Sequence, residues 1–243
     1  GGPATFVPKI VNYFQNELDY EIEILTLSDG KNLDIKDRFF VKRIDRNLPI
    51  IYRWLKTIFT IYKLGKNKDL IFVNGLGTES TIANIFLKKK IVRKIVGDPV
   101  WERAYNKGKV SENFDEFQVK NYGLSISLQK KVRSFSIKNS DLVITPSQHL
   151  KNFILNLGFQ NKIETINNGI NIPEESAEKF TNDQTNITIV SRLVTHKNIE
   201  KIIAAISDLN NSLIKLNIIG DGPELNQLQS IASRSNNKEN VIF

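Results

Sequence analysis

The sequence has no cysteine, no methionine and only two histidines among its 243 residues. The absence of cysteine excludes a disulfide framework and a thiolate site, and it fits a cytosolic protein. Two isolated histidines, His149 and His196, do not make a metal cluster without cysteine nearby. No apolar run approaches the roughly 20 residues that a membrane-spanning helix needs. These absences favour a globular protein that has neither a metal centre nor a transmembrane segment.

The charge is strongly unbalanced toward basic residues. Lysine and arginine number 34 and aspartate and glutamate 26, which gives a formal net charge of +8. Such a balance favours an anionic partner, whether a nucleotide, a phospholipid head group or a nucleic acid, without choosing among them. With 40% apolar residues, the chain is long enough for two modest domains with real cores.

The most informative stretch covers residues 187–224. A short β-branched run at 187–190 gives way to helical spacing from Ile199 to Leu209, and the change of period falls in a loop that carries Arg192 and Lys197. An arginine fork and a lysine point charge, placed between a strand and the start of a helix, suit a diphosphate. The alternative interpretation is a solvated basic loop with no ligand.

A second strand is predicted at residues 214–219, and Gly220-Asp221-Gly222-Pro223 follows it. The two glycines allow a tight turn, and Pro223 suits the first position of the next helix. The glycines could serve the turn alone.

Together, Arg192, Lys197 and the Gly-Asp-Gly-Pro turn resemble the retaining glycosyltransferases of family 4, which have the GT-B fold. The resemblance implies that Arg192 and Lys197 bind the diphosphate of a nucleotide sugar and assist catalysis, with Gly220 and Gly222 beside the donor. The resemblance also implies that Gly1 and Gly2 help to bind the donor. Family members carry a Gly-Gly loop at the edge of the interdomain cleft, near the donor phosphate or the acceptor. The glycines could equally be a remnant of cloning.

Strands alternate with helices on both sides of a polar linker, which predicts an α/β protein with two doubly wound, Rossmann-like domains that face a cleft. We place the first domain at residues 1–173, the linker at 174–186 and the start of the second domain at 187–243. Because the chain opens without a strand and ends as another strand begins, we expect a fragment that lacks the first strand and most of the second domain, and that is inactive by itself.

A strand predicted at residues 91–96 ends in a polar stretch that contains Asp98, Trp101 and Glu102. Open α/β sheets bind ligands at this edge. Many family 4 members have a histidine near here, whereas this chain has Gly97-Asp98. Asp98 is therefore a tentative catalytic candidate, and Trp101 and Glu102 are candidates for the acceptor side. The structural alternative is that Asp98 caps a turn and Trp101 packs in a core.

Two further segments have open interpretations. The predicted helix at residues 48–65 mixes aromatic and cationic side chains and could lie on an anionic membrane, although an ordinary helix packed on a sheet has the same features. Residues 110–123 are polar and are expected to form a mobile segment over the cleft, anchored by Phe114, Phe117 and Tyr122. His149 is expected at the surface of a helix's first turn, whereas His196 could touch phosphate.

The hypothesis is transfer of a sugar from a nucleotide diphosphate sugar to a hydroxyl of a carbohydrate or lipid-linked acceptor, with retention, in surface polysaccharide or glycolipid synthesis. No Asp-x-Asp metal-binding element is present, so we expect no metal and no cofactor. The expected location is cytoplasmic, and peripheral contact with the inner face of an anionic plasma membrane is left open. Alternatives are a nucleotide-sugar epimerase of the same fold, a dinucleotide-binding oxidoreductase, which lacks its third glycine here, or a basic nucleic-acid-binding module.

Overall fold

The computed structural model of the chain describes residues 3–29, 40–169, 185–209, 211–236 and 238–243. The chain divides into two compact units, one made of Gly1–Gly97 with Leu124–Asn168 and the other of Asp98–Gly123 with Gly169–Phe243. The sequence-based division differs for residues 98–123, which it assigned to the first domain. The expected linker lies mostly outside the described residues, and its last two positions, Thr185 and Asn186, already belong to a strand.

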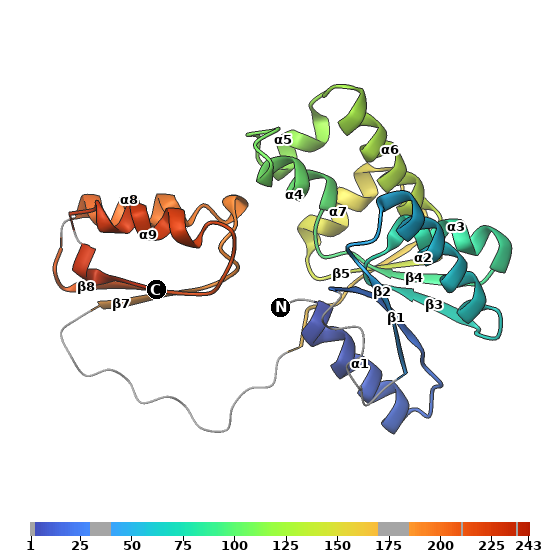
Figure 1. Ribbon diagram of the computed structural model, residues 1–243. Helices are drawn as coiled ribbons and strands as arrows, with labels where there is room; N and C mark the ends of the chain where they lie inside the picture. Colours follow the sequence, from blue (N-terminus) through green and yellow to red (C-terminus); the bar gives the residue numbers. More distant parts are fainter. Residues whose placement is uncertain (1–2, 30–39, 170–184, 210, 237) are drawn as a thin grey trace. The chain divides into compact units, whose positions relative to one another are not determined.

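The first unit is an alternation of parallel strands and helices (Figure 1). Strands β3, β4, β5 and β6 form one sheet in sequence order, and β1 and β2 pair in a separate parallel sheet. Crossover connections that contain helices account for the parallel pairing. The elements of this unit are α1 (Pro3–Glu17), β1 (Ile24–Ser28), β2 (Val41–Asp45), α2 (Ile50–Gly65), β3 (Leu70–Val73), α3 (Gly77–Leu87), β4 (Lys90–Lys94), α6 (Leu124–Lys138), β5 (Leu142–Thr145), α7 (Gln148–Asn156) and β6 (Lys162–Thr165).

The core of the first unit lies between the sheet and its helices. β-branched side chains at Val73, Ile91 and Val143 fill the strand positions, and they are buried. Helix α7 contributes Phe153 and Ile154 and begins at the cap Ser147, whose hydroxyl accepts from the Leu150 N–H. His149 lies exposed in the first turn of this helix, as predicted.

The second unit contains a three-stranded parallel sheet in the order β7, β8, β9. Strand β7 begins at Thr185, two residues before the predicted start, and β8 occupies residues 214–219 as predicted. The elements are α4 (Pro99–Asn106), α5 (Phe114–Val119), β7 (Thr185–Val190), the 3₁₀ turn η2 (Thr195–Lys197), α8 (Ile199–Leu209), β8 (Ile214–Ile219), α9 (Leu225–Ser233), the 3₁₀ turn η3 (Lys238–Asn240) and β9 (Val241–Ile242).

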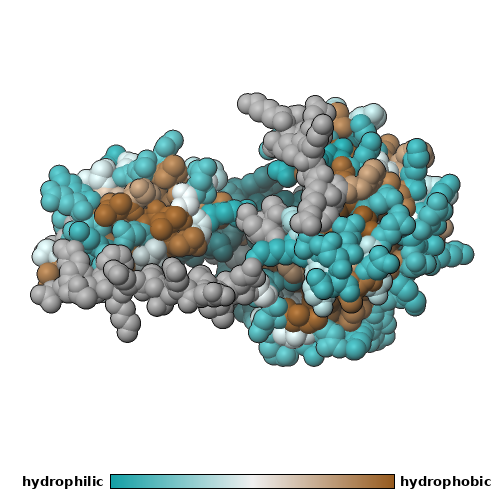
Figure 2. Space-filling view, turned by 90° about the horizontal axis from the view of Figure 1, so that it is seen from below, coloured by the Kyte–Doolittle hydropathy of each residue, from teal (hydrophilic) through white to brown (hydrophobic). Residues whose placement is uncertain are grey.

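Helices α8 and α9 lie on one face of this sheet (Figure 1). Their apolar stripes meet Leu216 and Ile218 of β8 in a core that includes Ile203, Ile206 and Leu228. Within the described residues, the opposite sheet face carries exposed apolar side chains, among them Val190 and Ile219. Figure 2 shows the second unit from this side, with a group of hydrophobic residues coloured brown. Side chains therefore alternate between a covered and an uncovered face along each strand.

Residues 110–123 are more ordered than expected. Asn113 and Glu116 form a reciprocal capping box that starts helix α5, and Phe117 in that helix is completely buried. Its ring lies 5.0 Å from that of Tyr122. Two of the three expected anchors are thus packed together. Residues 114–119 are helical because the cap at Asn113 satisfies the first free N–H groups.

Across the described part of the chain, no helix is both long and apolar enough to span a membrane.

Candidate phosphate-binding site

The site is built from the loop between β7 and α8. Its anchor is Leu193, whose side chain has no exposed surface and belongs to the core of the second unit. The flanking Arg192 and the more distant Lys197 are both exposed. Within the described residues, neither cation forms an ion pair. A buried leucine thus fixes the loop and leaves two cations available to an anion from solution.

The Gly-Asp-Gly-Pro turn holds this loop in place through backbone hydrogen bonds. The Leu193 N–H donates to the Asp221 carbonyl at 3.0 Å, and the Glu224 N–H donates to the Leu193 carbonyl at 3.1 Å. A Cβ atom on Gly220 would stand 1.8 Å from the Ser191 carbonyl oxygen, and one on Gly222 would stand 2.2 Å from that of Leu193. The two glycines therefore permit the close approach of the two loops. This is a structural role, and their predicted contact with the donor stays a prediction.

The end of the loop is fixed in the same manner. Turn η2 closes with the Lys197 N–H donating to the Val194 carbonyl at 2.9 Å, and Asn198 adopts the left-handed conformation before α8 begins. The Thr195 hydroxyl donates to the Glu224 carboxylate at 3.2 Å, next to the start of α9. Lys197 is consequently presented from a rigid turn at the amino end of a helix, where anions are favoured.

Helix α4 contacts η2 within the second unit. Both the backbone N–H of His196 and its ring Nδ1 reach the Asn106 Oδ1 atom, at 3.4 and 2.9 Å. Because that oxygen accepts from both, Nδ1 carries the proton. The Trp101 ring lies 5.8 Å from the His196 ring, and the Tyr105 hydroxyl donates to Asn198 Oδ1 at 3.4 Å. The acceptor-side candidate Trp101 is thus brought to the same loop as the cations.

The electrostatics of His196 reflect this environment. Partial burial lowers its pKa from the ordinary value, the nearby Glu102 raises it, and the cations Lys197 and Arg192 lower it further. The net direction is downward, so His196 is neutral at physiological pH. Glu102, the other acceptor-side candidate, therefore lies within electrostatic range of the loop.

Asp98 has the structural role that the sequence left open. Its carboxylate is fully buried and caps α4, with Oδ1 accepting from the Val100 N–H at 3.0 Å and Oδ2 from the Gln118 amide at 3.0 Å. Two hydrogen bonds and complete burial make it a poor candidate for proton exchange with a substrate. Gly1 and Gly2, the remaining predicted site residues, lie outside the described residues.

Several residues of this cluster were not found from the sequence. They hold the loop in place by packing or by hydrogen bonds, and they are Leu193, Asn106, Tyr105 and Glu224. A signal existed for Tyr105, which follows Trp101 at the helical spacing of four residues and whose ring lies 5.4 Å from that of Trp101. No sequence signal pairs Asn106 with His196, because 90 residues separate them.

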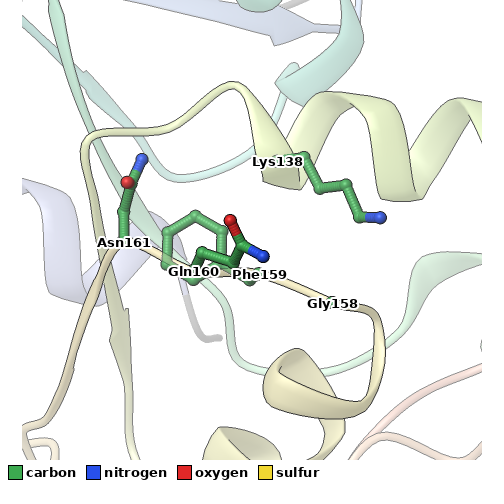
Figure 3. A pocket seen from close by; sticks show the side chains of 5 residues that line it. All are labelled: Lys138, Gly158, Phe159, Gln160 and Asn161. Atoms are coloured by element: carbon green, nitrogen blue, oxygen red, sulfur yellow. The ribbon is translucent and has the colours of Figure 1, made fainter.

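A cavity of about 350 Å³ lies elsewhere in the first unit, where α7 leads into β6 (Figure 3). It is lined by Lys138, Gly158, Phe159, Gln160 and Asn161. This cavity is at the amino end of its strand, whereas ligands of open α/β sheets bind at the carboxyl end. None of the predicted site residues lines it. Among the described residues, no group of three or more histidine, cysteine, aspartate or glutamate side chains gathers in a way that could hold a metal ion.

The sequence of residues 171–243 matches the family model described as glycosyl transferases group 1. This segment contains Arg192, Lys197 and the Gly-Asp-Gly-Pro turn. The match covers less than a third of the chain. No curated protein matches the sequence.

Solved structures extend the likeness to the whole chain. A lipopolysaccharide outer core galactosyltransferase, WaaB, in its apo form, aligns with 100% of this chain and 63% of its own length, at 14% identity and a TM-score of 0.62. HepE of Anabaena in complex with UDP aligns with 100% of this chain and 65% of its own, at 17% identity and a TM-score of 0.60. The chain shares their fold. That fold confirms the predicted α/β architecture of parallel, Rossmann-like sheets.

A third structure covers less of both chains. TarM of S. aureus, in complex with Fondaparinux, alpha-GlcNAc-glycerol and UDP, aligns with 78% of this chain and 36% of its own, at 19% identity and a TM-score of 0.55. This chain therefore spans less than two thirds of the length of each of these proteins. At such low identities the likeness shows the fold alone.

Proposed function

We propose that the chain belongs to a retaining glycosyltransferase of family 4, which moves a sugar from a nucleotide diphosphate sugar to a hydroxyl of a carbohydrate or lipid-linked acceptor. The observation that carries the proposal is the pair Arg192 and Lys197. Both are exposed, form no ion pair with any residue that the structure describes, and stand on a loop that Leu193 and two glycines hold in place. The match of residues 171–243 to glycosyl transferases group 1 supports it. A role in polysaccharide or glycolipid synthesis and a cytoplasmic location are part of the proposal.

The chemistry requires that negative charge be stabilised on the leaving group. The bond between the anomeric carbon and the diphosphate oxygen breaks, and its electrons stay with the diphosphate. The acceptor oxygen bonds to the anomeric carbon, and the acceptor's proton passes to the departing phosphate. Arg192 would bind two phosphate oxygens with its planar fork, and Lys197 would add a point charge. Fixed donors of this kind commonly contribute about 3 kcal/mol each to catalysis. In this proposal the two side chains take the place of a metal ion.

The complexes of HepE and TarM contain UDP, which makes UDP the first nucleotide to test. The proposal is tested by calorimetric titration of the chain with UDP, GDP, ADP and NAD in the presence of EDTA. We expect one nucleoside diphosphate to bind, and Arg192→Ala to weaken that binding by about 30-fold or more, which is about 2 kcal/mol, because a charge-assisted bidentate contact is lost. Lys197→Ala should weaken it by about tenfold.

Matched controls come from the same unit. Arg234 and Lys201 are exposed, of the same residue types, and outside the loop. Arg234→Ala and Lys201→Ala should leave nucleotide binding within about twofold of the wild type, as surface substitutions usually do. Equal losses in all four variants would mean that only net charge matters. In that case, strong salt-sensitive binding to arbitrary oligonucleotides would favour the nucleic-acid-binding alternative.

Transfer and its stereochemistry need a separate measurement. Incubation with the preferred nucleotide sugar and a hydroxyl acceptor, followed by NMR of the anomeric proton, would show a product with the donor's configuration if the reaction is retaining. Conversion of the donor into its sugar epimer, with no acceptor consumed, would instead identify an epimerase.

A further inference from the structure

The two ring nitrogens of His196 have different surroundings. Nδ1 lies 2.9 Å from the Asn106 Oδ1 atom, and the backbone N–H of His196 reaches the same atom at 3.4 Å. A backbone N–H can only donate, so the shared atom is the amide oxygen and the ring proton is on Nδ1. In the neutral ring Nε2 then carries a lone pair. Among the residues that the structure describes, none forms a hydrogen bond with Nε2, and the side chain is only partly buried.

Helix α4 fixes the orientation of this ring. The Trp101 ring packs edge-on against the His196 ring, with centroids 5.8 Å apart and planes at 62°. Trp101 is held in turn, because its Nε1 donates to the Glu112 carbonyl at 3.0 Å and the Phe114 ring lies 5.7 Å away. One hydrogen bond and one ring contact therefore give the Nε2 lone pair a fixed direction.

The charges around His196 keep its ring neutral. Partial burial lowers the pKa of His196, the cations Lys197 and Arg192 lower it as well, and Glu102 opposes them without reversing the direction. A neutral Nε2 accepts a hydrogen bond and cannot donate one. The oxygens of an ionised diphosphate are acceptors too, so Nε2 is unsuited to them. A hydroxyl is a donor, and a nucleotide sugar carries several.

We propose that His196 is a specificity-determining residue whose Nε2 atom accepts a hydrogen bond from a hydroxyl of the transferred sugar. This inference rests on the proposed function, in which Arg192 and Lys197 hold the diphosphate to which that sugar is attached. Trp101 and Glu102, the acceptor-side candidates, belong to the helix that packs on His196. The transferred sugar is the part of the donor that meets the acceptor, which favours it over the ribose. A site that pairs with a substrate hydroxyl discriminates against analogues that lack it.

Calorimetry with and without the sugar tests this inference. Wild-type protein is titrated with UDP, UDP-glucose, UDP-galactose and UDP-N-acetylglucosamine in the presence of EDTA, and at least one nucleotide sugar should bind more tightly than UDP. His196→Asn keeps an N–H for Asn106 but has no atom at the place of Nε2. Its affinity for that nucleotide sugar relative to UDP should fall about fivefold, as for the loss of one neutral hydrogen bond.

Two further variants sharpen the result. His196→Gln brings an amide oxygen near the place of Nε2 and should recover part of the relative affinity. His149→Asn, at the exposed histidine of α7, should leave it unchanged. Deoxy analogues of the preferred nucleotide sugar identify the hydroxyl, because the analogue that lacks it should bind wild-type protein and His196→Asn with equal affinity.

The outcomes separate this inference from the proposed function. An unchanged relative affinity in His196→Asn would overturn the inference, and so would equal losses for UDP and the nucleotide sugar, which would assign His196 to the phosphates, the ribose or the base. In both cases Arg192→Ala would still weaken UDP binding and the proposed function would stand. If no nucleotide bound, the proposed function would fail and this inference with it.

The tautomer can be measured without any ligand, because the chain has only two histidines. In ¹⁵N NMR spectra of the imidazole nitrogens, His196 should show a protonated Nδ1 and an unprotonated Nε2, with the exposed His149 as the reference. The preferred nucleotide sugar should shift the Nε2 signal of His196 more than UDP does. A proton on Nε2, in the free protein or in the complex, would overturn the inference. This readout does not depend on glycosyl transfer.

Discussion

The chain places two pairs of basic residues near the carboxyl ends of parallel strands, and the two pairs differ in every physical respect. Arg93 and Lys94 at the end of β4 are 4% and 7% exposed, whereas Arg192 and Lys197 after β7 are exposed on a loop. The side chains of the buried pair bind other groups of the protein. The exposed pair has no ion-pair partner within the described residues. Residue type alone therefore does not identify a phosphate-binding cation.

The buried pair shows how a fold accommodates cations without carboxylates. The guanidinium of Arg93 donates to the Ser140 hydroxyl at 2.8 Å and to the Thr81 hydroxyl at 3.0 Å. Burial lowers its pKa to about 10. Lys94 points to the opposite side of the strand, donates to Asn168 Oδ1 at 2.7 Å and lies 3.6 Å from the centroid of the Phe6 ring. Hydroxyls, an amide and an aromatic face thus replace the anion that these groups would otherwise need.

The first prediction concerns the Gly-Asp-Gly-Pro turn, which holds the loop that carries Arg192 and Lys197. In Gly220→Ala, the added Cβ would stand 1.8 Å from the Ser191 carbonyl oxygen, so one of the two backbones must shift. We expect the free energy of unfolding to fall by about 3 kcal/mol, the upper range for overpacking, and nucleotide binding to weaken with it. Urea denaturation followed by circular dichroism measures the first effect, and calorimetry the second.

Gly123→Ala is the matched control, because nothing lies within 4 Å of a Cβ atom at Gly123. Its free energy of unfolding should stay within about 0.5 kcal/mol of the wild type. If Gly220→Ala were equally harmless, the pairing of the two loops would not hold the site together.

Much of this arrangement could be predicted from the sequence. The change from β-branched alternation to helical spacing located β7, α8 and β8, since both periods are strong over these segments. Element ends shifted by up to two residues. Strand β4, predicted to run to Val96, ends at Lys94, although the Ile95 N–H still donates to the Ile144 carbonyl at 2.9 Å. The exposure of Arg192 and Lys197 followed from their place in a loop.

Other features could not be predicted, because they depend on contacts between distant segments. Burial of Arg93 relies on Thr81 and Ser140, which lie 12 and 47 positions away. The packing of α4 against η2 joins residues about 90 positions apart. The role of Gly220 and Gly222 in loop packing is likewise invisible in a motif, where the same glycines suggest phosphate binding. Local patterns predict elements, whereas burial of a polar group is decided by tertiary structure.

The second prediction concerns the buried Arg93, whose replacement should affect stability and not nucleotide binding. Arg93→Met removes the donor that satisfies two buried hydroxyls, so the free energy of unfolding should fall by about 2 kcal/mol. Nucleotide binding should be unchanged, because Arg93 belongs to the first unit and is buried among the side chains of that unit. Arg192→Ala should show the opposite pattern, with weakened binding and unchanged stability. Urea denaturation measures the stability of both variants and calorimetry measures their nucleotide binding. Each variant should change one of these two quantities and leave the other as in the wild type.

A result in which Arg93→Met weakened UDP binding at unchanged stability would contradict the distinction between buried and exposed cations. Arg93→Lys provides an intermediate case. It keeps the charge but loses the fork that serves two hydroxyls, so it should recover only part of the stability.

The smallest predicted effect concerns the histidine between the exposed cations. Since the pKa of His196 is lower in the folded chain than in the unfolded one, the unfolded state binds more protons in the window below about pH 6.5. The stabilising contribution is present above that pH and is lost as the pH falls through the folded pKa. His196→Asn keeps an N–H that can reach Asn106 but does not titrate. Wild-type protein should therefore lose more stability than this variant between pH 7.5 and pH 5.

The chain supplies a close control in its only other histidine, the exposed His149. All these proteins carry the same carboxylates, so a difference in pH dependence between the two variants is assigned to the histidines. Urea denaturation at both pH values should give His149→Asn the wild-type pH dependence and His196→Asn a shallower one. If the two variants behaved alike, the packing of His196 against Trp101 and Asn106 would not exclude enough water to disfavour its charged form, and the contact between α4 and the cation loop would be too loose to position an acceptor there.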